Sequence, residues 1–158
     1  MSALFEVEVS TTLTAIHLAK GRRLPTKDVE RAVVETQKGI VGDRYHGTRH
    51  RHVSLQSRAQ LDEAAATYGA PIASELTRRN LTLADGVVPT APGTRITVGE
   101  GEDAVELEVV RVAAPCKLLD DTIGPDAQHA LRRRAGTICR VLSGGEIAVG
   151  DTVTWVAP

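Results

Sequence analysis

Aromatic side chains are scarce in this chain, which has one Phe, one Trp and two Tyr, 3% of its residues. So few rings offer little of the stacking surface that nucleic-acid-binding proteins use. Charge of one sign is lacking too, because 19 basic side chains face 20 acidic ones, for a net charge of −1. No overall field attracts nucleic acid or a membrane, so any anion site must be a local group of basic residues.

Cysteine and long apolar runs are also rare. The two cysteines, Cys116 and Cys139, form no C-x-x-C motif, which argues against a disulfide framework and a zinc site. No run of about 18 apolar residues occurs, and the N-terminus has no basic segment followed by an apolar one. We therefore expect a soluble, cytoplasmic protein without a membrane partner.

The 158 residues contain no repeat or linker, which predicts one domain over residues 1–158. Ser57 and Gln60 form a capping box that predicts a helix ending at Gly69. A helical turn is expected over 73–77 and a second helix from Pro125 to Gly136. Period-two alternation predicts strands over 5–9, 13–19, 32–36, 53–56, 80–83, 95–98, 104–112, 137–142 and 151–156. Many short strands with two or three inserted helices indicate a mainly β fold, a closed or nearly closed β-barrel.

Cys116 follows the strand predicted over 104–112, directly after Pro115. A thiol where a strand ends can project from the rim of a scaffold, although a free cysteine is also commonly a small buried hydrophobe. The second face of that strand changes from glutamate to Val110 and Val112, so we expect the strand to enter the core and deliver Cys116 to a pocket rim. Cys139 lies in an apolar strand and is expected to be buried.

Basic residues gather in two other segments. Arg78, Arg79 and Asn80 stand where a helical turn meets a strand, and a guanidinium binds phosphate oxygens in pairs, so they are candidates for an anion clamp. Solvated arginines and a capping asparagine are the alternative. Arg44 follows the glycine-rich Gly42-Asp43 turn. His50 and His52 alternate with arginines, which on a strand favours a basic rim for an anion over metal ligation.

Four segments in this order resemble the MOSC domain, the module named for the C-terminal part of molybdenum cofactor sulfurase. They are Lys38 to Gly47, Thr77 to Leu81, the Pro-Cys-Lys-Leu-Leu at 115–119, and Arg134 to Gly136 with Arg140 to Asp151. The resemblance spans about residues 30–156. It implies a β-barrel-like fold, a reactive cysteine, and handling of sulfur or of the molybdenum cofactor.

The resemblance implies roles for particular residues. Cys116 would be the reactive residue and the molybdenum ligand, as its equivalent is in relatives that reduce N-hydroxylated compounds. An Arg-x-Asn that contacts the cofactor in relatives corresponds to Arg78 and Asn80. Arg79, Arg44, Lys117 and His52 are further expected cofactor-binding residues. Lys117 or a nearby arginine would favour the thiolate of Cys116.

The larger molybdenum enzymes of this kind carry an additional N-terminal barrel, whereas we expect residues 1–30 to form at most two strands, leaving the cofactor site to be completed differently or by a partner. The first functional hypothesis is a molybdenum-cofactor protein that reduces N-oxygenated compounds with electrons from a separate donor protein. The second is a sulfur carrier that holds a persulfide on Cys116, received from a donor such as a cysteine desulfurase. A third is a small-ligand barrel with an inert thiol. Pyridoxal phosphate is not expected, because no Schiff-base site is indicated.

Overall fold

The computed structural model describes residues 6–157, and its centre is a closed barrel. Seven strands form the ring, in the order β1 (Val7–Leu18), β11 (Thr152–Ala157), β7 (Arg95–Val98), β8 (Val105–Val112), β9 (Thr137–Ser143), β5 (Val53–Ser57) and β6 (Leu81–Leu83). β1 closes it by pairing with β11 through its first half and with β6 through its second. The predicted β-barrel is confirmed.

Strand β1 joins what the sequence suggested were two strands. Its 12 residues run without interruption because it changes partners midway, with a register shift against β6 between Leu13 and Ala15. Phe5, expected at the start of this strand, lies outside the described residues. A short strand, β2 (Lys27–Val29), pairs with the end of β1.

A second sheet of three strands lies beside the barrel, made of β10 (Gly145–Ala148), β3 (Arg31–Glu35) and β4 (Gly39–Ile40). The sequence predicted β3 but no strand between residues 142 and 151. The structure differs, because β10 begins at Gly145 and pairs with β3. Ile147 is the one fully buried side chain of β10. A single buried position gives no alternation of apolar and polar residues from which a strand could be predicted.

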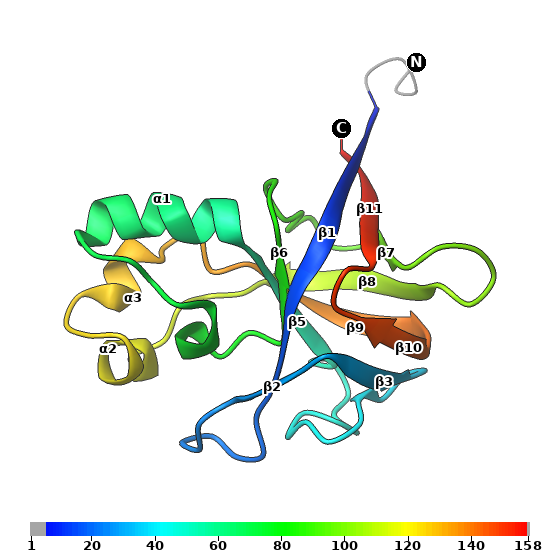
Figure 1. Cartoon of the computed structure of the whole chain (residues 1–158), viewed down its shortest axis with the longest axis horizontal. Coiled ribbons are helices and arrows are strands. Elements are labelled where there is room, and N and C mark those ends of the chain that lie inside the picture. The colour runs from blue at the N-terminus through cyan, green and yellow to red at the C-terminus, as the bar shows by residue number, and fades with distance from the viewer. Residues whose placement is uncertain (1–5, 158) are drawn as a thin grey trace.

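The helices gather at one side of the barrel (Figure 1). Helix α1 (Arg58–Tyr68) begins as predicted, with the Ser57 side chain accepting from the Gln60 amide at 3.1 Å, and ends at Gly69. It connects β5 to the parallel strand β6, followed by the 3₁₀ turn η2 (Ser74–Thr77). No helix of residues 6–157 is long and apolar enough to cross a membrane.

The predicted helix from Pro125 to Gly136 is wrong. Helix α3 covers only Ala127–Ala130, and α2 (Leu118–Thr122), which was not predicted, precedes it. Asp126 and Arg133 adopt left-handed backbone conformations, with φ of 69° and 64°, which a right-handed helix cannot contain.

Aliphatic side chains fill the barrel, and a smaller apolar cluster lies beneath α1. Val105, Leu107 and Val109 of β8 face inward, and Cys139 is buried as expected. The other face of β8 does not enter the core, since Val112 is 51% exposed. A register shift between Val109 and Arg111 breaks the alternation near the end of the strand and turns Arg111 outward.

Candidate functional site around Cys116

Cys116 lies in the connection between β8 and α2. After β8 the Ala113 amide donates to the Gly136 carbonyl at 3.0 Å, which keeps the chain beside β9 for one more residue. The Cys116 carbonyl then accepts from the Leu119 amide at 3.0 Å as α2 begins. The thiol is exposed, so the prediction of an accessible sulfur in this loop is confirmed.

Positive charge lies near this sulfur, because Arg51, Arg78 and Arg79 each interact electrostatically with Cys116. Arg44 and Arg51 lie in the loop from β4 to β5. Arg78 and Arg79 lie between η2 and β6, and Arg111 lies in β8. We call this group the arginine cluster: Arg44, Arg51, Arg78, Arg79 and Arg111. Within residues 6–157 none of them forms an ion pair with a carboxylate. The cluster therefore presents uncompensated charge.

Burial and repulsion between neighbouring arginines lower the pKa values of Arg51, Arg78 and Arg79. The pKa of Arg79 is lowered to about 10, mainly by burial and secondly by the neighbouring Arg51. Burial is also the main reason that the pKa values of Arg51 and Arg78 are lowered. Negative charge on Cys116 acts in the opposite direction on all three arginines. Sulfur and guanidinium groups thus lie close enough to share one field.

Arg79 is the most firmly placed member of the arginine cluster. It is 6% exposed, its Nε donates to the Ala135 carbonyl at 2.8 Å, and its Nη2 donates to the Ala114 carbonyl at 3.3 Å. With Arg51 and Arg111 it lines a cavity of about 120 Å³ against residues 112–114 and Ile138. Three guanidinium groups on a cavity of this size are suited to a small oxyanion.

Tyr45 organises the loop side of the cluster, and the sequence analysis did not identify it. The guanidinium carbons of Arg44 and Arg51 lie 4.4 Å and 4.2 Å from its ring centroid, and Arg44 also donates to its hydroxyl. Asp43 holds this loop in place, since its carboxylate accepts from the amides of Ala19 and Tyr45 at 3.0 Å and 3.2 Å.

Arg78 is held differently from the bidentate clamp that the sequence suggested. Its Nη1 and Nη2 donate to the carbonyls of Leu24 and Gly21, at 2.6 Å and 2.8 Å, so both arms of its fork bind the chain itself. Its Nε is buried and has no hydrogen-bond partner in residues 6–157, and the same is true of Arg51 Nε. An anion near Cys116 would meet the charges of Arg78 and Arg51.

Asn80 and His52 are placed inside the fold. The Asn80 side chain accepts from the Ser54 amide at 3.0 Å and donates to the His17 carbonyl at 3.1 Å, which joins β5 to β1. His52 precedes β5 rather than lying on a strand, and it is 1% exposed. Its Nδ1 accepts from the Val141 amide at 2.9 Å and its Nε2 donates to the Thr48 carbonyl at 2.8 Å, so His52 forms no basic rim.

Two further features border the thiol. Lys117 is exposed and immediately precedes α2, so its ammonium group adds mobile positive charge next to Cys116. A groove of about 580 Å³ runs along residues 112–115. The charged and ionisable residues that also line it are Asp120, Asp126, His129, Arg132 and Arg133. The residues that lead to Cys116 therefore lie between an arginine-lined cavity and a groove that can admit a small molecule.

The comparisons with known proteins give the family. The MOSC domain model matches residues 42–154. Among solved structures, the YuaD protein from Bacillus subtilis has a TM-score of 0.83 at 18% identity, over 97% of this chain and 99% of that one. YiiM from Geobacillus stearothermophilus has a TM-score of 0.72 at 18% identity, over 93% and 75%. YiiM from Escherichia coli has a TM-score of 0.68 at 16% identity, over 95% and 71%. No curated protein matches in sequence. With more than half of its residues matched by the family model, this chain belongs to the MOSC domain family.

Proposed function

We propose that this MOSC protein binds the molybdenum cofactor, with Cys116 as the metal ligand and the arginine cluster as the site for the cofactor's phosphate. The observation that carries the proposal is an exposed sulfur set among guanidinium groups that form no ion pair within residues 6–157. A thiolate is a soft ligand, and guanidinium groups are suited to phosphate.

The residues present fit that cofactor better than a bare metal ion. Within residues 6–157 no group of three or more His, Cys, Asp or Glu side chains could hold a metal ion. A metal at Cys116 must therefore bring other ligands with it, as a metal bound by a dithiolene does. The buried, unpartnered Nε atoms of Arg51 and Arg78 are donors that an anionic ligand would satisfy.

Each residue contributes one part of the binding. Cys116 supplies one thiolate, Arg51, Arg79 and Arg111 bind oxyanion oxygens in their shared cavity, and Lys117 adds positive charge at the entrance. The bound cofactor supplies two-electron chemistry. The reaction that we propose is reduction of an N-hydroxylated compound, in which the N–O bond breaks and two electrons and two protons yield the amine and water. The electrons come from a separate donor protein.

A second function is favoured by the exposure of Cys116. In this alternative the thiolate attacks the terminal sulfur of a donor persulfide, the donor's S–S bond breaks, and the donor leaves as a thiolate. Cys116 then carries the sulfur to an acceptor. The arginine cluster would stabilise the negative charge of the persulfide in the absence of any metal.

Elemental analysis of the full chain, expressed in a host that makes the cofactor, separates the two functions. The cofactor hypothesis predicts molybdenum approaching one atom per chain, lost in Cys116→Ser, because a hydroxyl is a hard and weakly acidic donor. The carrier hypothesis predicts sulfane sulfur without molybdenum. Cys139→Ala is the matched control, since the buried Cys139 should be dispensable in both cases. Equal losses in the two variants would contradict a specific role for Cys116.

A further inference from the structure

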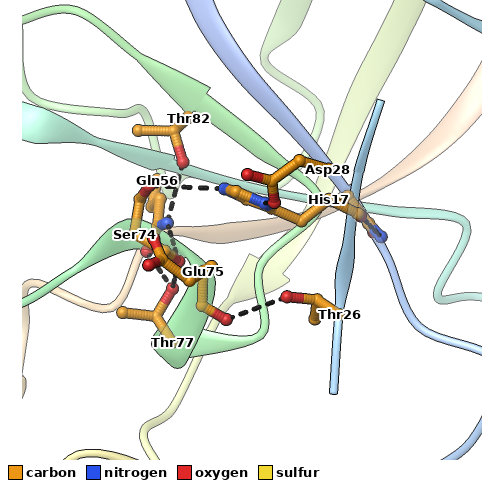
Figure 2. Close-up of polar contacts among 9 residues, drawn as sticks. His17, Thr26, Asp28, Gln56, Ser74, Glu75, Thr77 and Thr82 are labelled. Carbon is orange, nitrogen blue, oxygen red and sulfur yellow. Dashed lines mark hydrogen bonds and ion pairs between the residues drawn. The ribbon is translucent and has the colours of Figure 1, made fainter. Parts of the chain in front are cut away.

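A second group of polar residues lies outside the arginine cluster, where β1, β2 and η2 meet (Figure 2). His17 of β1 is 2% exposed, and its two ring nitrogens have different partners. Nδ1 lies 2.6 Å from Asp28 Oδ1, and Nε2 lies 3.3 Å from Ser74 Oγ. A carboxylate, an imidazole and a hydroxyl therefore form a continuous chain of hydrogen bonds.

The fold fixes the first of these contacts. β1 and β2 pair antiparallel, and the register places His17 directly opposite Asp28. Both residues lie in regular strands, so their contact is determined by backbone pairing. A carboxylate on Nδ1 selects the tautomer in which Nδ1 carries the proton. Nε2 is then the lone-pair nitrogen that faces the Ser74 hydroxyl.

The backbone of Ser74 is also fixed by hydrogen bonds, at the start of η2. Its carbonyl accepts from Gln56 Nε2 at 3.2 Å and from Thr77 Oγ1 at 2.8 Å. Thr26 Oγ1 donates to the Glu75 carbonyl at 3.1 Å and ties the chain before β2 to η2 (Figure 2). Ser74 as a residue is half-buried, so it lies near the surface of the fold.

A pocket of about 230 Å³ lies beside η2 and is lined by Glu75 and Leu76, although Ser74 itself is not part of its wall. Pro25 and Leu76 give it apolar walls, and Arg78 brings positive charge to its surface. Its volume suits a short acyl chain, and the charge of Arg78 would favour an ester oxygen that becomes negative during attack.

We propose that Ser74, His17 and Asp28 form a nucleophilic triad that hydrolyses small, uncharged esters, an activity separate from that of Cys116. Ser74 Oγ bonds to the acyl carbon while its proton passes to His17 Nε2, and the alcohol leaves with that proton. Water then cleaves the acyl-serine ester and restores the hydroxyl. Asp28 is the positioning residue that fixes the imidazole.

The test is labelling of the full chain with a fluorophosphonate probe, followed by peptide mapping of the modified residue. We expect labelling at Ser74, abolished in Ser74→Ala. Asp28 is 72% exposed, so Asp28→Asn should fold normally and slow labelling at least about tenfold, because an amide no longer selects the productive tautomer. Asp62→Asn, at another exposed carboxylate, is the matched control and should not change the rate.

Labelling must also be unchanged in Cys116→Ser, which distinguishes this activity from the proposed cofactor function. Hydrolysis of p-nitrophenyl acetate in the Cys116→Ser background provides the second readout, with the thiol removed as a competing nucleophile. Absence of label at Ser74, or an Asp28→Asn rate equal to that of the parent, would overturn the triad and leave a purely structural network.

Discussion

Arg79 combines buried charge with hydrogen bonds that only a guanidinium can make together. Arg79→Lys keeps the charge but cannot satisfy both the Ala135 and Ala114 carbonyls in the same geometry. We expect the free energy of unfolding to fall by about 1–3 kcal/mol. Urea denaturation of the variant measures it, with the exposed Arg132→Lys as the control. Equal stability of the two variants would show that the carbonyl contacts contribute little.

His52 gives a pH-dependent prediction at the same scale. Burial lowers the pKa of His52. Its Nδ1 accepts from the Val141 amide, a contact that requires this nitrogen to be unprotonated. The unfolded chain then binds more protons than the folded one as the pH falls below the ordinary histidine pKa of about 6.5. The stabilisation from neutral His52 is complete above that pH and is lost in acid. Urea denaturation at pH 7.5 and 5.5 should show a smaller loss in His52→Gln than in the parent.

Among the elements, β9 depends on a glycine at its start. Gly136 has a φ of +92°, and a Cβ there would lie 1.8 Å from the Leu55 carbonyl oxygen of β5. Gly136→Ala should therefore destabilise the protein by at least about 3 kcal/mol, combining backbone strain with a clash that neither strand can relieve. Gly93 is the matched control, with a φ of +89° and no atom within 4 Å of the added Cβ.

Gly93→Ala should carry the conformational cost alone, about 1 kcal/mol. Thermal unfolding of both variants measures the difference, which isolates the contact between β5 and β9. If the two substitutions cost the same, close approach at Gly136 is not what the glycine provides.

The elements that could be predicted from the sequence are those with a local signal. Helix α1 has its cap at Ser57 and its stop at Gly69, and β7 and β8 have regular alternation. Helix α2 and strand β10 were missed because five and four residues are too few to establish a period, and tertiary contacts supply their stability. Left-handed Asp126 and Arg133 carry no sequence signature, since neither is a glycine.

The candidate site could be predicted only in part for a related reason. Cys116 was identifiable from its place after a strand, and Arg79 from its neighbours. Arg51 and Arg111 could not be assigned, because they meet across the loop before β5 and the end of β8, 60 positions apart in the chain. Tyr45 beside two arginines was a visible signal that the sequence analysis did not use.

For the molecule as a whole, folding brings the five arginines of the cluster together without carboxylates of residues 6–157 to pair with them, and their repulsion lowers the stability of the folded state. An oxyanion that binds the folded state alone should stabilise it by about 1–2 kcal/mol at concentrations some tenfold above its Kd. We expect inorganic phosphate to raise the Tm by several degrees more than potassium chloride of the same ionic strength. Arg111→Gln, at an exposed cluster position, should reduce that excess. Equal shifts from the two salts would mean that the cluster binds no phosphate.

The isolation of Cys116 has a consequence for how this protein meets oxidants. Mild oxidation converts an accessible thiolate to a sulfenic acid, which a resolving cysteine in the same chain can rescue by forming a disulfide. The chain has two cysteines, and the second, Cys139, is buried in the barrel. A sulfenic acid at Cys116 therefore cannot form a disulfide with another cysteine of the same chain. Its repair must come from a thiol outside the molecule, such as glutathione, and without one oxidation proceeds to the irreversible sulfinic acid.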